Sequence, residues 1–437
     1  MVFDRLFGRK RKKRQDPGIR YGRYSDNNKS PEQVSSWTEA DRLFREEQYT
    51  ESLDAFFHYL TDAQVGNVVY ERTNYTGRFE LMQGSKIVRG SFDNSILQAE
   101  VALARMPESN VPVMRRLLEM NFHLYYSRFA FHDDIVCMRF DSDITTINPN
   151  KLYYGLRELA TKADKQDDLL VQEFAGLQPT DLEHVVPLPE QERQVKYLHM
   201  QQWLAATLDY VRTLDPEKFA GGIAYLLIAV VFRIDFLVSP EGKLMNEMEK
   251  IVDKYYRKDE KPTPERNLQM IEALQRLRNK SPEDVYPYLF RSKHTFSIVS
   301  PQHQKSVAET INNALQNMYW YRDNNYPLIA NEVMEYSLSY SQFSYSLPKP
   351  FTELFQLYME INHGKFFEDL GYGFRLYNET ENRFEEDEIR ERIDDIVNEW
   401  QSKYRNFTFD TGRLKFGNRI QFNQTFLVEL TTLNFDS

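Results

Sequence analysis

The chain has 437 residues, of which 41% are hydrophobic and 27% charged, a composition typical of a soluble globular protein with two or three domains. Its single cysteine excludes an internal disulfide framework and favours a reducing compartment. The net charge is −10, but residues 1–24 alone carry +7, which leaves −17 on the remaining chain. An acidic body argues against specific nucleic-acid binding.

Residues 1–30 are predicted to be a disordered basic tail, because a run of charges is followed by short polar and turn-forming residues. No apolar segment follows the charges, so a secretory signal is not expected. The run could solubilise the chain, bind nucleic acid non-specifically or contact an anionic membrane surface. The candidate residues for contact with an anionic surface are Arg9, Lys10, Arg11, Lys12, Lys13 and Arg14.

Residues 31–176 are predicted to form a first, α+β domain. Two short helices lie between residues 36 and 62, and strands follow at 78–82 and 96–103. A helix at 111–124 then leads into a hairpin at 128–140, and a long amphipathic helix at 151–174 ends the unit. The stripe expected to bury the 111–124 helix consists of Met114, Leu117, Leu118 and Phe122.

This order of elements predicts a small antiparallel sheet whose helices cover only one face. The second face is then available for binding, with capture of an extended polypeptide along the sheet as the mechanism. The candidate partner-binding residues are Phe79, Leu81, Val88 and Phe92. The same four side chains could instead form the core face of the sheet, and their alternation with polar residues fits either role.

Residues 177–192 contain three prolines and are predicted to be a linker to a second domain, residues 193–437. This domain is expected to be mainly helical, with a strand at 294–299 and a set of antiparallel strands at 407–430. Its most apolar segment, residues 219–238, is interpreted as a central core helix rather than a membrane span, because Arg233 and Asp235 interrupt it.

The familiar catalytic and nucleotide-binding motifs are absent from the sequence. No catalytic residue, no metal site and no cofactor is therefore predicted. Cys137 lies in an apolar strand and is interpreted as a buried, unreactive thiol. The acidic cluster His132-Asp133-Asp134 is interpreted as the turn of the predicted hairpin.

Four segments together resemble the YbjN-type branch of the CesT-like superfamily of type III secretion chaperones. They are residues 95–101, 114–121, 127–131 and 135–140, and the resemblance covers about residues 36–175. It implies a chaperone-like α+β module that binds other proteins without ATP and often forms homodimers. Secretion chaperones are usually small single domains, whereas this chain adds a large second region and a basic tail.

The sequence thus predicts a cytoplasmic, non-enzymatic, bacterial protein-binding module with an unidentified protein partner. A homodimer is one possible assembly, and no specific nucleic-acid ligand is expected. Two alternatives remain. The first is an adaptor held at the inner membrane surface by the basic tail, and the second is an uncharacterised enzyme in the C-terminal region.

Overall fold

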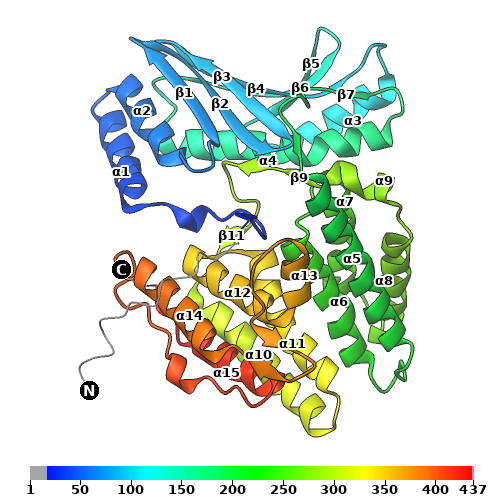
Figure 1. Ribbon diagram of the computed structural model, residues 1–437. Coiled ribbons are helices and arrows are strands. Elements are labelled where there is room, and N and C mark those ends of the chain that lie inside the picture. Colours follow the sequence, from blue (N-terminus) through cyan, green and yellow to red (C-terminus); the bar gives the residue numbers. More distant parts are fainter. Residues whose placement is uncertain (1–16, 436–437) are drawn as a thin grey trace, which may run out of the picture.

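The main sheet of the computed structural model, which describes residues 17–435, has eight antiparallel strands, and the six longest follow the order β1-β2-β3-β4-β6-β5 (Figure 1). The predicted hairpin is confirmed, and its turn residues Asp133 and Asp134 both have positive φ. The six long strands are β1 (Val68–Thr73), β2 (Thr76–Gly84), β3 (Lys86–Phe92), β4 (Ile96–Arg105), β5 (Arg128–His132) and β6 (Ile135–Asp143).

Helices cover one face of this sheet, as predicted. The long helix α4 (Pro149–Glu173) runs along the face, while α1 (Pro31–Arg45) and α2 (Tyr49–Leu60) pack at one end and α3 (Val111–Asn121) at the other. Asn148 caps α4 by accepting a hydrogen bond from the Lys151 amide. The apolar face of α4 and the alternate residues of the strands form one continuous core.

Residues 17–30, here called the N-terminal strap, pass between the sheet layer and the helical second part. Tyr21 is 8% exposed and packs on Phe236 and Phe367, and the Gly22 amide donates to the Phe236 carbonyl at 2.9 Å. Positive φ at Gly22 brings its backbone close to the Phe236 ring. The predicted disorder of residues 1–30 is therefore wrong for residues 17–30, while residues 1–16 lie outside the described part.

The predicted linker is also structured. Its strand β7 (Gln178–Pro179) pairs with β4, and its strand β8 (Val186–Pro187) pairs with β9 (Phe290–Arg291) of the second part. Only the start of the predicted 294–299 strand forms, as β10 (Lys293–His294), which pairs with β2. The two parts of the chain are thus joined by strand pairing at several points.

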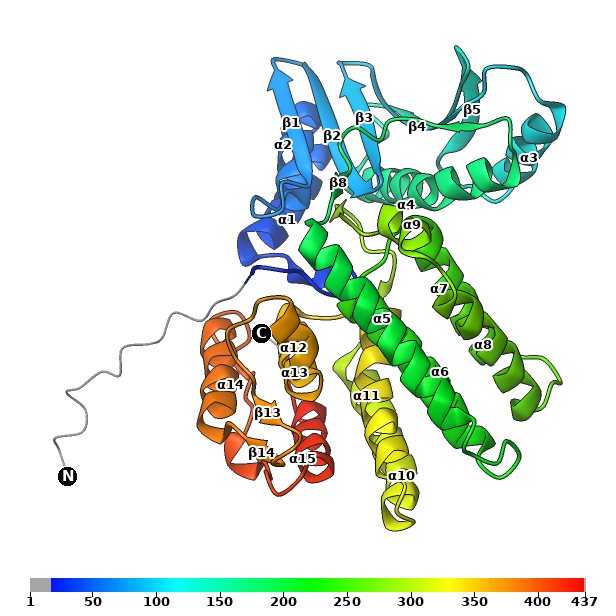
Figure 2. The ribbon, with the colours of Figure 1, turned by 45° about the vertical axis from the view of Figure 1, so that its right-hand side comes forward.

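The second part is built mainly of helices that run away from the sheet layer (Figure 2). Its centre is α6 (Ala220–Leu237), which packs against α5, α7, α8 and α11. Among residues 17–435, α6 is the one helix long and apolar enough to cross a membrane, but 83% of it is buried inside the protein. The other helices are α5 (Glu190–Val211), α7 (Gly242–Tyr256), α8 (Thr263–Arg278), α9 (Pro282–Val285), α10 (Gln304–Asp323), α11 (Pro327–Ser344), α12 (Lys349–Asn362), α13 (Gly364–Asp369), α14 (Glu386–Trp400) and α15 (Arg419–Thr431).

The C-terminal segment differs from the prediction. The antiparallel strands expected at 407–430 are replaced by a 3-10 turn at Thr411–Arg413 and the helix α15. Phe422, Phe426 and Leu430 recur every four residues and are all fully buried, which is the helical period. The remaining strands of this part have two residues each: β11 (Ser300–Pro301), β12 (Tyr345–Ser346), β13 (Tyr377–Asn378) and β14 (Arg383–Phe384).

Candidate protein-binding surface

The four residues predicted to contact a partner lie in the core. Phe79, Leu81, Val88 and Phe92 are between 0% and 4% exposed and face the covering helices. The Phe79 ring, for example, lies 4.6 Å from that of Phe57 in α2. Their prediction as partner-binding residues is wrong, because the apolar face of the strands is the face that the helices of the same chain cover.

The face of the sheet away from the helices carries a row of charged side chains across four strands. Glu80, Arg89, Glu100 and Arg139 occupy directly opposed positions on β2, β3, β4 and β6. We call this row of alternating charge the charge ladder. Arg89 lies 3.6 Å from Glu80, and Arg139 pairs with Glu100, with all four side chains at least 40% exposed. Exposed pairs of this kind contribute about 0–1 kcal/mol each. The row itself offers no apolar surface to a partner, although Val69 of β1, directly opposite Glu80, is 45% exposed.

One edge of the sheet is protected by a side chain. The amide of Phe129 in β5 donates to Asn121 Oδ1 at 2.7 Å, and Asn121 Nδ2 donates to the Phe129 carbonyl at 3.4 Å. The Asn121 side chain, at the end of α3, therefore takes the hydrogen bonds that an added strand would otherwise make. Strand addition at β5 is disfavoured at this position.

Exposed apolar side chains are scattered over the surface of residues 17–435, but the four with the highest exposure lie on α3 or just after it. Val111, Leu118, Phe122 and Tyr125 are exposed by 79%, 66%, 89% and 92%. The spacings of seven and four residues place Val111, Leu118 and Phe122 along one side of the helix. We call these four residues the α3 stripe. Figure 2 shows α3 at the outer end of the sheet layer, away from the second part.

A second apolar side of α3 attaches the helix to the domain. Val113, Leu117 and Met120 are buried against the sheet, so the helix is apolar on two sides. The sequence prediction placed Leu118 and Phe122 in the buried stripe, and that prediction is wrong. The sequence did contain evidence for a second apolar side. An 11-residue helix needs only one apolar side to pack on its own core, so further apolar residues on other sides are free to remain exposed.

The loop that carries Tyr125 is held in place by Glu158 of α4. Its carboxylate accepts hydrogen bonds from the amides of Tyr125, Tyr126 and Ser127 and from the Ser127 hydroxyl, at 2.7–3.0 Å. Burial opposes ionisation of Glu158, but these hydrogen bonds outweigh it and lower the pKa of the carboxyl. Tyr125 is thus exposed on a fixed loop, which reduces the entropy lost when a partner binds.

The other predicted residues have no role at this surface. Cys137 is 1% exposed, and burial raises the pKa of its thiol to about 11, so it is an unreactive core residue. Arg9, Lys10, Arg11, Lys12, Lys13 and Arg14 lie outside the described residues. Within residues 17–435, no group of three or more His, Cys, Asp or Glu side chains is placed to hold a metal ion.

Comparison with protein-family models gives no match to this chain, and comparison with curated proteins gives none either.

Proposed function

We propose that this protein is a non-enzymatic, chaperone-like module that binds polypeptides through the α3 stripe. The observation that carries the proposal is a group of four large apolar side chains, each more than 60% exposed, on α3, a helix that already has its own buried side, and on the loop that follows it. Contiguous exposed apolar surface on a folded domain marks an interaction site.

The occupant that fits this surface is a second copy of the chain. If two α3 helices pack antiparallel about an axis near Leu118, Val111 of each copy meets Tyr125 of the other. The same arrangement places Arg115 of each copy beside Glu119 of the other, because both residues lie on the same flank of the stripe. An interface of this type is self-complementary, as two-fold symmetry requires.

The test is the oligomeric state of the full chain, measured by light scattering after size-exclusion chromatography. The wild type is expected to dimerise with rising concentration. Burial of one leucine contributes about 1.5–3 kcal/mol and the dimer loses one from each copy, so Leu118→Glu should weaken it by roughly 100-fold or more. The matched control is Leu268→Glu, because Leu268 is also an exposed leucine, at 59%, but lies on α8.

A cross-linking experiment tests whether the two copies pack with Leu118 near the two-fold axis. Leu118→Cys would place a thiol next to the proposed axis, and the one native cysteine, Cys137, is buried. Mild oxidation should therefore give a covalent dimer of Leu118→Cys and none of Leu268→Cys. A monomeric wild type at every concentration, with no cross-link at position 118, would reject self-pairing. Saturable binding of an amphipathic helical peptide that Leu118→Glu abolishes would then assign the stripe to a different protein.

A further inference from the structure

A polar cleft lies in the second part, far from the α3 stripe, between α5, the α12–α13 junction and the segment that contains β13. Its cavity volume is about 200 Å³. The polar side chains that line it are those of His199, Gln202, Asn362, His363, Lys365, Arg375, Tyr377 and Glu379, so one carboxylate also lies at its edge. Nothing in the proposed protein-binding role uses these residues.

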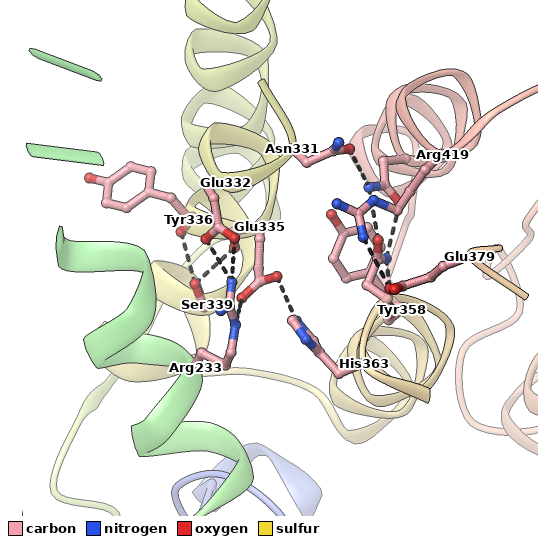
Figure 3. A network of polar contacts seen from close by, with 12 residues as sticks. Arg233, Asn331, Glu332, Glu335, Tyr336, Ser339, Tyr358, His363, Glu379 and Arg419 are labelled. Atoms are coloured by element: carbon pink, nitrogen blue, oxygen red, sulfur yellow. Dashed lines mark hydrogen bonds and ion pairs between the residues drawn. The ribbon is translucent and has the colours of Figure 1, made fainter. Parts of the chain in front are cut away.

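His363, which lines the cleft, is held by an ordered chain of charges behind it (Figure 3). Arg233 of α6 donates to Glu332 and Glu335 of α11, each at 2.6 Å, and His363 Nε2 lies 2.8 Å from the second oxygen of Glu335. Burial opposes ionisation of Glu335, but Arg233 and His363 outweigh it and bring the pKa of this carboxyl down to about 2. Because Glu335 is ionised, His363 must donate through Nε2, which leaves Nδ1 out of this interaction.

A second histidine is oriented in the same way. His199 Nε2 lies 2.8 Å from Asp369 Oδ2, and Lys365 is paired with the other oxygen of Asp369. The Trp203 ring stands between the two histidines, with centroid distances of 5.6 Å to His199 and 5.8 Å to His363. Both imidazole rings are therefore fixed beside a flat aromatic wall.

Arg375 also lines the cleft and is exposed to solvent. Its Nε donates to the Tyr377 carbonyl at 3.2 Å, and its stem passes so close to Gly364 that a Cβ there would lie 3.4 Å from Arg375 Cγ. Among residues 17–435, no carboxylate forms an ion pair with Arg375. A guanidinium held through Nε keeps its terminal nitrogens available for a planar oxyanion.

We propose that this cleft binds a small oxyanion, a carboxylate or a phosphoryl group, with Arg375 and Lys365 as the charged contacts and His199 and His363 as hydrogen-bonding groups. Because the two histidine rings and the guanidinium are already held by neighbouring groups, less conformational entropy is lost when the anion binds. The site is independent of α3, so this proposal stands or fails separately from the proposed protein binding.

The test uses the full chain and two probes, inorganic phosphate and succinate, with sodium chloride at matched ionic strength as the reference. Binding is followed by calorimetry and by the NMR signals of the histidine rings, with His199 and His363 assigned through His199→Gln and His363→Gln. We expect saturable shifts of these two rings. Arg375→Gln should weaken binding roughly 10- to 100-fold, as expected for the loss of a charged hydrogen-bonding partner.

The matched control is Arg383→Gln, because Arg383 is a 63% exposed arginine on the neighbouring strand β14 and does not line the cleft. It should bind like the wild type. Preference for phosphate over succinate supports a phosphoryl ligand, and the reverse preference supports a carboxylate. The proposal is overturned if neither anion shifts the two rings beyond chloride, or if Arg375→Gln and Arg383→Gln weaken binding equally.

Discussion

Arg23 of the N-terminal strap donates to both carboxylate oxygens of Asp235 in the central helix α6, at 2.9 Å to Oδ1 and 3.1 Å to Oδ2. The two side chains are only 9% and 6% exposed. Arg23 also pairs with Glu249 of α7, which in turn pairs with Lys165 of α4 in the sheet layer. The strap therefore joins the central helix to the interface between the two parts of the chain.

Arg23→Ala should destabilise the protein strongly, because it leaves Asp235 buried without its cation. Loss of one partner of a buried ion pair costs about 3–5 kcal/mol. The free energy of unfolding measured with urea tests this. The double variant Arg23→Met, Asp235→Leu should recover most of the loss, since no charge is then left unpaired. A loss below 1 kcal/mol for Arg23→Ala would show that the strap contributes little to stability.

Asp164 of α4 should make the protein less stable as pH rises. Burial and the nearby carboxylates Asp167 and Glu241 raise the pKa of Asp164 to about 7, against the opposing effects of His294 and the Ser85 amide. The folded protein then holds the proton more tightly than the unfolded chain, so stability is lost between about pH 4 and pH 7. Asp164→Asn should be about 1–2 kcal/mol more stable than the wild type at pH 8, and equal to it at pH 4.

Urea unfolding at a series of pH values measures this difference. Asp209→Asn is the control, because Asp209 is 59% exposed. An Asp164→Asn variant that gains nothing at pH 8 would show that Asp164 is ionised in the folded protein without cost.

Glu335 should show the opposite dependence on pH. Its pKa of about 2 in the folded protein lies below the ordinary value of 4.5, so its contribution to stability is present above about pH 4.5 and is lost as pH falls toward 2. We expect Glu335→Gln to reduce the free energy of unfolding by about 2–3 kcal/mol at pH 7, with a smaller difference at pH 3. The same Asp209→Asn control applies. A pH-independent loss would indicate that packing, rather than charge, explains the effect.

Asn121→Ala should open the β5 edge. The substitution removes both hydrogen bonds to the Phe129 backbone, at a cost of about 1–2 kcal/mol. Hydrogen exchange of the Phe129 amide should accelerate, while that of Met138 in the neighbouring strand β6 should change little. We also expect faster aggregation, because an unprotected edge strand can pair with other chains. Unchanged exchange at Phe129 would contradict the role assigned to Asn121.

The sequence alone determined the first part of the fold well. The α+β class, the turn at Asp133-Asp134 and the core helix within residues 219–238 are confirmed, because each depends on neighbouring residues or on a clear period. The period of Phe422, Phe426 and Leu430 was equally present in the sequence. The strand prediction there followed a competing alternation of apolar and polar residues.

Only the tertiary structure decided which apolar side chains remain exposed. Periodicity identifies an apolar face, but burial depends on whether another part of the chain reaches that face. Phe79 of β2 is covered and 1% exposed, whereas Phe122 at the end of α3 is uncovered and 89% exposed. The order of the N-terminal strap and the composition of the cleft also depend on tertiary contacts. Arg23 meets Asp235 more than 200 residues later, and His363 meets Glu335 on a different helix. A polar segment becomes ordered when charges from distant parts of the chain offset the desolvation cost of burying it. Which charges come together depends on distances in space, and these do not follow from spacing in the sequence.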